Sequence, residues 1–207
     1  MGFERTRESL HGIAELLLAG PQYRRDGTIR LRVVAGAIAT VTEPELRVDH
    51  LNVWASGTPV AVGGASYAEL GSRLGVVAGA PEGLYGEGSG AQLADRPQVD
   101  PDVALELLGA LYRGDQALRA FAPEQTPVLW PEHFDVGITV DEANYGVSLG
   151  DGYLDEPYMY VGPHKPRSGE FWNAPFGAAR PLPATSSASS IEEIAEFFTE
   201  GRRLAGV

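Results

Sequence analysis

Two runs of short segments with alternating hydrophobicity, each followed by a helical segment, constrain the fold of this chain more than any other feature. In the first run, within residues 28–62, Ile29, Leu31 and Val33 alternate with polar residues. The second run covers residues 127–161 and is interrupted by Gly and Pro turns. Such alternation is typical of antiparallel strands with one exposed face. Runs of strands followed by helices, rather than strict βαβ alternation, predict an α+β fold with a largely antiparallel sheet.

Four segments carry apolar residues at helical spacing. The first is expected to end at Gly20 and Pro21, because proline cannot continue a helix. Asp100, followed by Pro and Asp, predicts a helix start, since it can cap the first turn. Ser66 and Ser190 are predicted to cap the two short helices. The predicted helices cover residues 8–18, 66–74, 100–122 and 190–201.

The composition is that of an ordinary globular protein with one core. The chain has 207 residues, of which 43% are hydrophobic and 21% charged. A chain of this size buries roughly 70% of its unfolded surface on folding. We therefore expect a single α+β domain over residues 1–207, with the four helices packed on the sheet.

The charge balance argues against nucleic acid as a partner. The formal net charge is −12, with 28 acidic and 16 basic residues, which disfavours attraction to phosphate backbones and anionic lipid. One local exception is a basic group near residue 30, which either holds a small anion or forms surface ion pairs. It consists of Arg24, Arg25, Arg30 and Arg32.

Residue usage also limits the chemistry and the compartment. The chain has no cysteine, so disulfides, thiolate catalysis and sulfur-bound zinc are excluded. The first twenty residues contain Glu4, Glu8 and Glu15 and lack a long apolar stretch, so we expect neither a secretory signal nor a membrane span. A cytoplasmic location is the expectation.

Residues 75–98 form a long Gly-rich segment without periodicity. A loop of this length is unusual within a compact domain. It is interpreted either as a lid or flap over a site, or as surface chain without a role.

The strongest local feature is the sequence WPEHFD at residues 130–135. Alternation along a strand that starts here would place His133 and Asp135 on one face. A histidine beside a carboxylate can act as an oriented base or as part of a metal site, with Glu132 or Glu156 handling a second proton or a metal. The alternative is that His133 is a turn or packing residue.

Rings with polar edges gather in the last third of the chain. Such rings beside amides and carboxylates commonly hold small polar ligands, although about half of them should instead fill the core. The candidate binding residues are Trp130, Asn144, Glu156, Tyr158, Tyr160, Trp172 and Asn173. No phosphate-binding loop, dinucleotide fingerprint or nucleophile elbow is present, so the sequence implies no cofactor.

Four segments resemble an actinobacterial family of proteins without an assigned activity. They are LHGIAELLLAGPQYRRDGTIRLRV, PVLWPEHFDVGITV, ANYGVSLGDGYLDEPYMYVGP and FWNAPFGAA. More distantly, they are similar to a broader bacterial domain with a helix-then-strand opening. The resemblance implies that the WPEHFD and DEPYMY segments belong together, and it implies no activity or cofactor.

Three functional interpretations remain open. The first is a protein that binds a small polar molecule in a cleft lined from Trp130 to Trp172. The second is a hydrolase in which His133 is the base and Asp135 orients it, with or without a metal ion held by nearby carboxylates. The third is an acidic protein-interaction module, with a homodimer formed through an exposed sheet edge as a variant.

Overall fold

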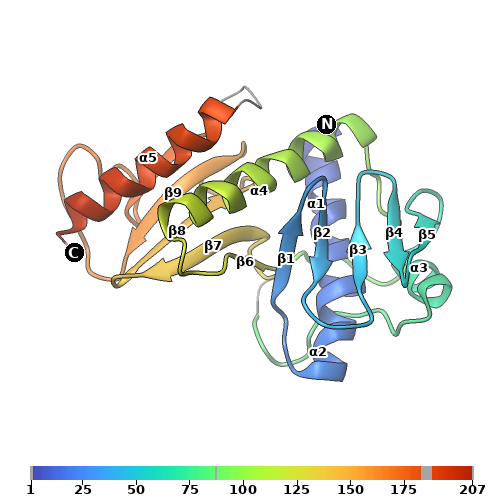
Figure 1. Ribbon diagram of the computed structural model, residues 1–207. Helices are drawn as coiled ribbons and strands as arrows, with labels where there is room; N and C mark the ends of the chain where they lie inside the picture. Colours follow the sequence, from blue (N-terminus) through green and yellow to red (C-terminus); the bar gives the residue numbers. More distant parts are fainter. Residues whose placement is uncertain (1, 87, 183–187, 207) are drawn as a thin grey trace. The chain divides into compact units, whose positions relative to one another are not determined.

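The computed structural model describes residues 2–86, 88–182 and 188–206 (Figure 1). It consists of helices and antiparallel strands, which confirms the α+β class and the largely antiparallel sheet. The chain divides into two compact units. Unit 1 comprises Met1–Leu108 and Leu129–Phe134, and unit 2 comprises Gly109–Val128 and Asp135–Val207.

The strands of unit 1 lie in the order β6-β1-β2-β3-β4-β5, with each pair antiparallel. They fall where the sequence alternation predicts them. Pro59 lies on the outermost strand, where a residue without an N–H is tolerated. The strands are β1 (Leu31–Val34), β2 (Ala37–Thr40), β3 (Leu46–Val48), β4 (Asn52–Ala55), β5 (Thr58–Ala61) and β6 (Val128–Trp130).

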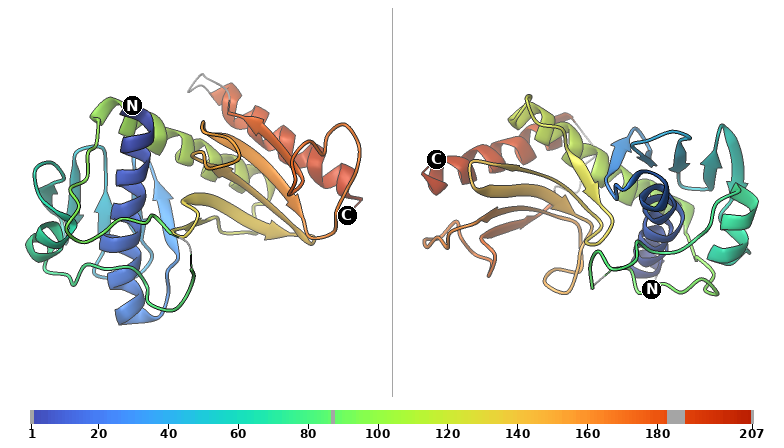
Figure 2. Two further views of the ribbon diagram at one scale, coloured as in Figure 1. Left: turned by 180° about the vertical axis from the view of Figure 1, so that it is seen from behind. Right: turned by 90° about the horizontal axis from the view of Figure 1, so that it is seen from below.

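A long N-terminal helix lies on one face of this sheet and runs roughly along its strands (Figure 2). It consists of α1 (Gly2–Ile13), the π-helical segment η1 (Ala14–Ala19) and α2 (Gly20–Asp26). The predicted helix end at Gly20 and Pro21 is therefore wrong. In the wider π turn the Gly20 N–H donates to the Glu15 carbonyl, and the helix passes Pro21 without a break. The helix ends at Gly27, which has φ 73° and donates its N–H to the Tyr23 carbonyl.

A buried glutamine joins the end of this helix to the sheet. The amide nitrogen of Gln22 donates to the carbonyls of Thr28 at 2.9 Å and Arg30 at 2.8 Å. Its amide oxygen accepts the N–H groups of Val41 at 2.7 Å and Thr42 at 3.2 Å. All four bonds involve backbone groups just before β1 or just after β2, so Gln22 supplies hydrogen-bond partners to the chain beyond the helix.

The Gly-rich segment 75–98 runs along the N-terminal helix and is bonded to it at several points. The Gly79 N–H donates to the Leu16 carbonyl at 2.9 Å, an acceptor on the π turn. Farther along, the Gln98 N–H donates to the Ser9 hydroxyl at 2.8 Å. These bonds fix the segment against unit 1 as a strap.

Two of the predicted helix starts are confirmed. Helix α3 (Tyr67–Leu74) begins with a capping box, in which the Ser66 hydroxyl accepts the Glu69 N–H and the Glu69 carboxylate accepts the Ser66 N–H. Helix α4 (Pro101–Phe121) begins after Asp100, whose carboxylate accepts the Asp102 N–H at 3.0 Å. The boundary between the two units falls within α4, between Leu108 and Gly109.

Unit 2 contains four antiparallel strands in the order β7-β8-β9-β10. The first three correspond to the run predicted at residues 127–161, and the fourth lies outside that run. It also contains α5 and the part of α4 from Gly109 onward. The elements are β7 (Asp135–Val140), β8 (Ala143–Ser148), β9 (Tyr158–Pro163), β10 (Ala178–Pro181) and α5 (Ala188–Ala205).

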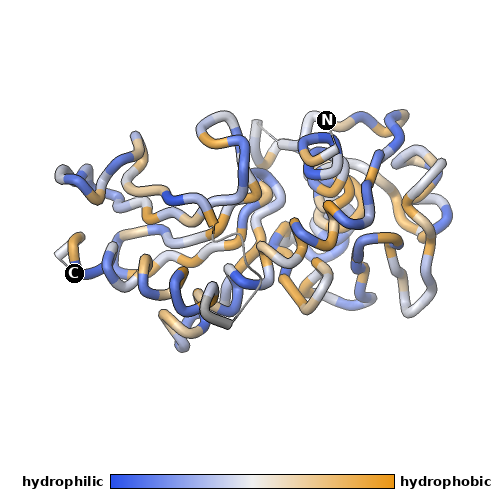
Figure 3. The backbone as a smooth tube through the Cα atoms, turned by 90° about the horizontal axis from the view of Figure 1, so that it is seen from above, coloured by the Kyte–Doolittle hydropathy of each residue, from blue (hydrophilic) through white to orange (hydrophobic). Residues whose placement is uncertain are grey.

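Both helices of unit 2 cover the same face of its sheet (Figure 1). The buried ring of Tyr145 on β8 lies 4.7 Å from Phe121 of α4 and 6.0 Å from Phe198 of α5. Hydrophobic and hydrophilic residues are interleaved along the chain, as amphipathic elements require (Figure 3).

The C-terminal helix differs from its prediction at both ends. It begins at Ala188, so Ser190 lies inside the first turn rather than at the cap. It continues past Gly201, where a Cβ would lie only 2.8 Å from a methyl carbon of Val161. The glycine thus permits close packing on β9. The Pro- and Ser-containing sequence at residues 183–189 predicts a linker, and of these residues 183–187 lie outside the described residues.

In the part of the chain that the structure describes, no helix is both long and apolar enough to cross a membrane.

Candidate functional site

The WPEHFD segment forms a turn rather than the start of a strand. The Phe134 N–H donates to the Trp130 carbonyl at 2.8 Å, and Phe134 has φ 53°. Strand β7 begins only at Asp135, so alternation does not place His133 and Asp135 on one strand face. The His133 side chain is 69% exposed, and its Nε2 lies 4.0 Å from Oε1 of Glu132.

Asp135 belongs to a different set of contacts, on the face of the unit 2 sheet opposite the helices. It is 8% exposed and accepts a hydrogen bond from the Tyr160 hydroxyl. The Tyr160 ring crosses Gly146 of β8, where a Cβ would lie 2.6 Å from the ring carbon that carries the hydroxyl. Burial, followed by the charge of Asp135, raises the pKa of Tyr160 well above its usual value.

Two further predicted binding residues share this sheet face and are engaged by their neighbours. Asn144 accepts the Thr139 hydroxyl at 2.7 Å. Tyr158 donates to Asp151 at 2.6 Å, and burial followed by this carboxylate raises the pKa of the phenol. These residues therefore support the sheet and its turns.

The remaining predicted binding residues are dispersed. Glu156 is exposed in the turn before β9. Trp130 belongs to unit 1, where the Arg30 guanidinium lies 5.9 Å from the ring centroid. Trp172 and Asn173 line a surface hollow in unit 2. The structure thus divides the predicted binding set among several places.

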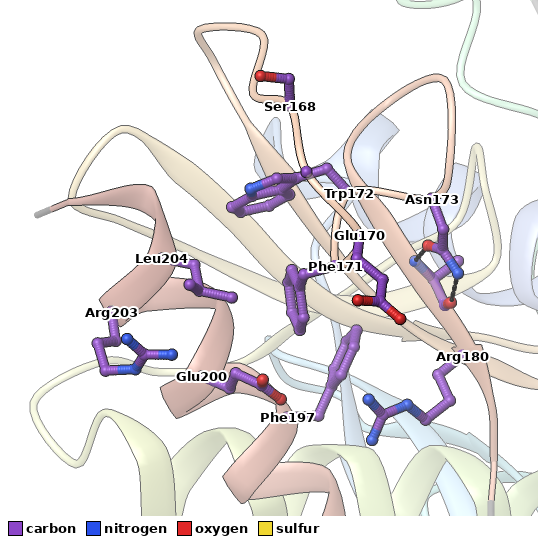
Figure 4. Close-up of a pocket in the computed structure, with 12 residues that line it drawn as sticks. Ser168, Glu170, Phe171, Trp172, Asn173, Arg180, Phe197, Glu200, Arg203 and Leu204 are labelled. Atoms are coloured by element: carbon purple, nitrogen blue, oxygen red, sulfur yellow. Dashed lines mark hydrogen bonds between the residues drawn. The ribbon is translucent and has the colours of Figure 1, made fainter.

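The hollow lined by Trp172 has a volume of about 560 Å³ and lies between residues 168–173, β10 and α5 (Figure 4). Phe171 stands edge-on to Trp172 with ring centroids 5.0 Å apart. It also lies 5.2 Å from Phe197 of α5, which is 3% exposed. The three rings form an apolar base, and the partly exposed Trp172 and Phe171 present ring surface to a ligand.

Asn173 shapes the wall of the hollow rather than offering free polar atoms to a ligand. Its side-chain amide donates to the Ala179 carbonyl at 3.0 Å and accepts the Ala179 N–H at 2.9 Å (Figure 4). Both polar atoms of the amide are used by β10. Asn173 therefore fixes the segment that carries Trp172.

Four charged side chains surround the rings. The Arg180 guanidinium lies 5.0 Å from the centroid of Phe197. Across the described residues, the side chains of Glu170, Glu200 and Arg203 make no hydrogen bond or ion pair within the protein. Arg180 and Arg203 are drawn on opposite sides of the rings (Figure 4). These groups can bind and orient a charged ligand.

Sequence reasoning missed the α5 side of this hollow. Phe197 and Glu200 fall within the helix predicted at residues 190–201, and Arg203 lies beyond its predicted end. The one signal for this side of the hollow is the pair of arginines in the last turn of α5. Basic residues at this position are also explained by the negative end of the helix dipole. Nothing in the sequence pairs this turn with Trp172, because the two are far apart in the chain.

A second group of titratable side chains lies in unit 1, where the strap meets η1. Glu15 is 4% exposed and accepts the Ser89 N–H at 2.9 Å. Burial, followed by the charge of Glu15, raises the pKa of Tyr85. Glu132 contributes to the same shift, and its Oε2 is buried without a hydrogen bond among the described residues. The bonds that Glu15 makes anchor the strap.

Within the described residues, no group of three or more His, Asp or Glu side chains is arranged to hold a metal ion. Comparison with protein-family models, curated proteins and solved structures finds no match.

Proposed function

We propose that unit 2 binds a small polar organic molecule in the hollow lined by Trp172. The observation that carries this proposal is the combination of a ring base with charged side chains that the protein itself leaves unpaired. The four charged side chains are exposed at the hollow, where a ligand of complementary charge can pair with them. The volume of about 560 Å³ suits a molecule of metabolite size.

The hollow also has a defined shape before a ligand arrives. Asn173 holds the Trp172 segment against β10 through two hydrogen bonds, and Phe197 is fixed in the packing of α5. A site formed in advance loses less conformational entropy on binding. These groups hold a ligand by stacking and charge pairing, so the proposed role is recognition.

A thermal-shift screen against small polar metabolites tests this proposal. Ligands that bind the folded state raise its stability by about 2.7 kcal/mol at a concentration one hundred times Kd. We expect ligands that stabilise the wild type and lose their effect in Trp172→Ala. Trp130→Ala is the matched control, because it removes an indole of unit 1 and should preserve the effect.

Two results would contradict the proposal. One is a screen in which no compound stabilises the wild type. The other is a set of compounds that stabilise Trp172→Ala as strongly as the wild type, which would place their binding elsewhere.

A further inference from the structure

The charges around the hollow differ in balance from those of the whole chain. The protein carries a formal net charge of −12. The hollow is lined by two arginines, Arg180 and Arg203, and two glutamates, Glu170 and Glu200, so its formal charge is zero. A ligand with a single sign of charge would meet repulsion from one of these pairs.

The two arginines are not equivalent. Arg180 lies over Phe197 at 5.0 Å, so the face of its guanidinium is already occupied by a ring. Arg203 makes no such contact, and its planar donors remain available for a carboxylate. Glu200 lies three residues earlier on α5, which places the two side chains on neighbouring positions of one helix face.

Opposite charges one turn apart, beside exposed ring surface, match a molecule with three features. It carries a carboxylate for Arg203, an ammonium group for Glu200, and a flat ring that packs on Trp172 and Phe171. We infer that the ligand of this hollow is a zwitterion with an amine, a carboxylate and a planar ring, such as a free aromatic amino acid. This inference rests on the proposed binding function of the hollow and specifies its ligand class.

The alternative is that Arg203 and Glu200 are ordinary solvated charges. In that case the ring surface alone would select ligands, and loss of the amine or the carboxylate from a ligand would change its affinity little. The two accounts therefore differ in how affinity responds to each charged group.

Isothermal titration calorimetry with three probes tests the inference: L-tryptophan, tryptamine without the carboxylate, and indole-3-propionate without the amine. Charge-assisted hydrogen bonds predict that wild-type protein binds tryptophan about tenfold or more tightly than either analogue. Arg203→Gln should abolish the preference over tryptamine, and Glu200→Gln the preference over indole-3-propionate.

Matched controls separate these effects from general changes of charge. Glu196→Gln removes a carboxylate from the same exposed helix without touching the hollow, and Arg73→Gln removes a guanidinium from unit 1. Both should retain the wild-type preferences. All four substitutions involve exposed or solvent-facing side chains, so the variants are expected to fold.

The outcomes distinguish the two proposals. Equal affinity for the three probes would overturn the zwitterion inference. The inference would also be overturned if none of the three probes bound while other compounds still stabilised the protein in a way that depends on Trp172. In both cases the proposed binding function would stand. If no compound depends on Trp172, both proposals fail.

Discussion

The hydroxyl of Tyr160 on β9 donates a hydrogen bond to the carboxylate of Asp135 on β7, across the intervening strand β8. The ring reaches this far because Gly146 and Gly137 provide no side chain beneath it. A tyrosine lying over two glycines covers the backbone that they would leave exposed. The contact therefore ties three strands together on the face that the helices do not cover.

We predict that Tyr160→Phe destabilises the protein by about 1–3 kcal/mol, because Asp135 is left with a buried carboxylate and one donor fewer. Urea denaturation measures this change. Tyr153→Phe is the control, because the Tyr153 hydroxyl makes only a long hydrogen bond of 3.4 Å to the Asn173 carbonyl and the Tyr153 side chain is exposed. Equal stability of the two variants would show that the hydrogen bond contributes nothing. In the double variant with Asp135→Asn, the losses should be smaller than the sum of the single losses.

Two glycines within α4 should respond in opposite directions to alanine. At Gly109 a Cβ would meet no atom within 4 Å, so Gly109→Ala should stabilise the helix by about 1 kcal/mol. At Gly114 a Cβ would lie 2.8 Å from the Cβ of Val147, a branched atom that cannot move aside. Gly114→Ala should destabilise by about 1–3 kcal/mol. Thermal denaturation of both variants checks the signs, and a stabilised Gly114→Ala would contradict this packing.

The strap depends on a close approach between Gly20 and Gly79. A Cβ on Gly20 would lie 1.7 Å from the Gly79 carbonyl oxygen, so either the helix or the strap must move. We expect Gly20→Ala to lose about 2 kcal/mol or more of stability. Limited proteolysis should also cut the strap faster. Gly63→Ala, which meets no atom within 4 Å, should behave as wild type. A strap equally protected in both variants would argue against this contact.

Stability should fall in mild acid because of His11. This ring stacks on Phe134 at 5.1 Å, and its Nε2 lies 2.6 Å from the Pro131 carbonyl. Burial lowers the pKa of His11 below 6.5, although the bond to Pro131 and the charge of Glu15 oppose this change. As the pH falls, the unfolded chain takes up the proton before the folded protein does. The contribution of neutral His11 to the free energy of unfolding is therefore complete above pH 6.5, and it is lost as the pH falls toward the lower pKa of His11 in the folded state.

The test compares the free energy of unfolding at about pH 7.5 and about pH 5.5 in the wild type and in His11→Gln. Glutamine can still donate to the Pro131 carbonyl but does not titrate. We expect the variant to lose less stability between the two conditions. An unchanged pH dependence would mean that His11 is not the responsible group.

Much of the fold follows from local signals. Alternation predicts both runs of strands, and the caps at Ser66 and Asp100 predict two helix starts. These signals succeed because the interactions behind them lie within a few residues. The same local logic predicts a helix end at Pro21 and is wrong there. A π turn, together with the Leu16 carbonyl that accepts the Gly79 N–H, allows the helix to continue.

The candidate site was less predictable for the same reason. Trp172 and Asn173 were predicted as binding residues, whereas their partners on α5 and β10 depend on tertiary packing. The strand β10 has only four residues, one of them proline, and offers little alternation. The turn at residues 131–134 has a positive φ at Phe134, which no glycine signals in advance. The predicted strand therefore includes His133, although β7 begins only at Asp135.

The amide of Asn173 has a consequence for assembly. By engaging both backbone polar groups of Ala179, it occupies the outer margin of β10 as an added strand would. Another polypeptide could extend the sheet at this point only by displacing that side chain. One amide thus both shapes a binding surface and protects an edge against unwanted aggregation.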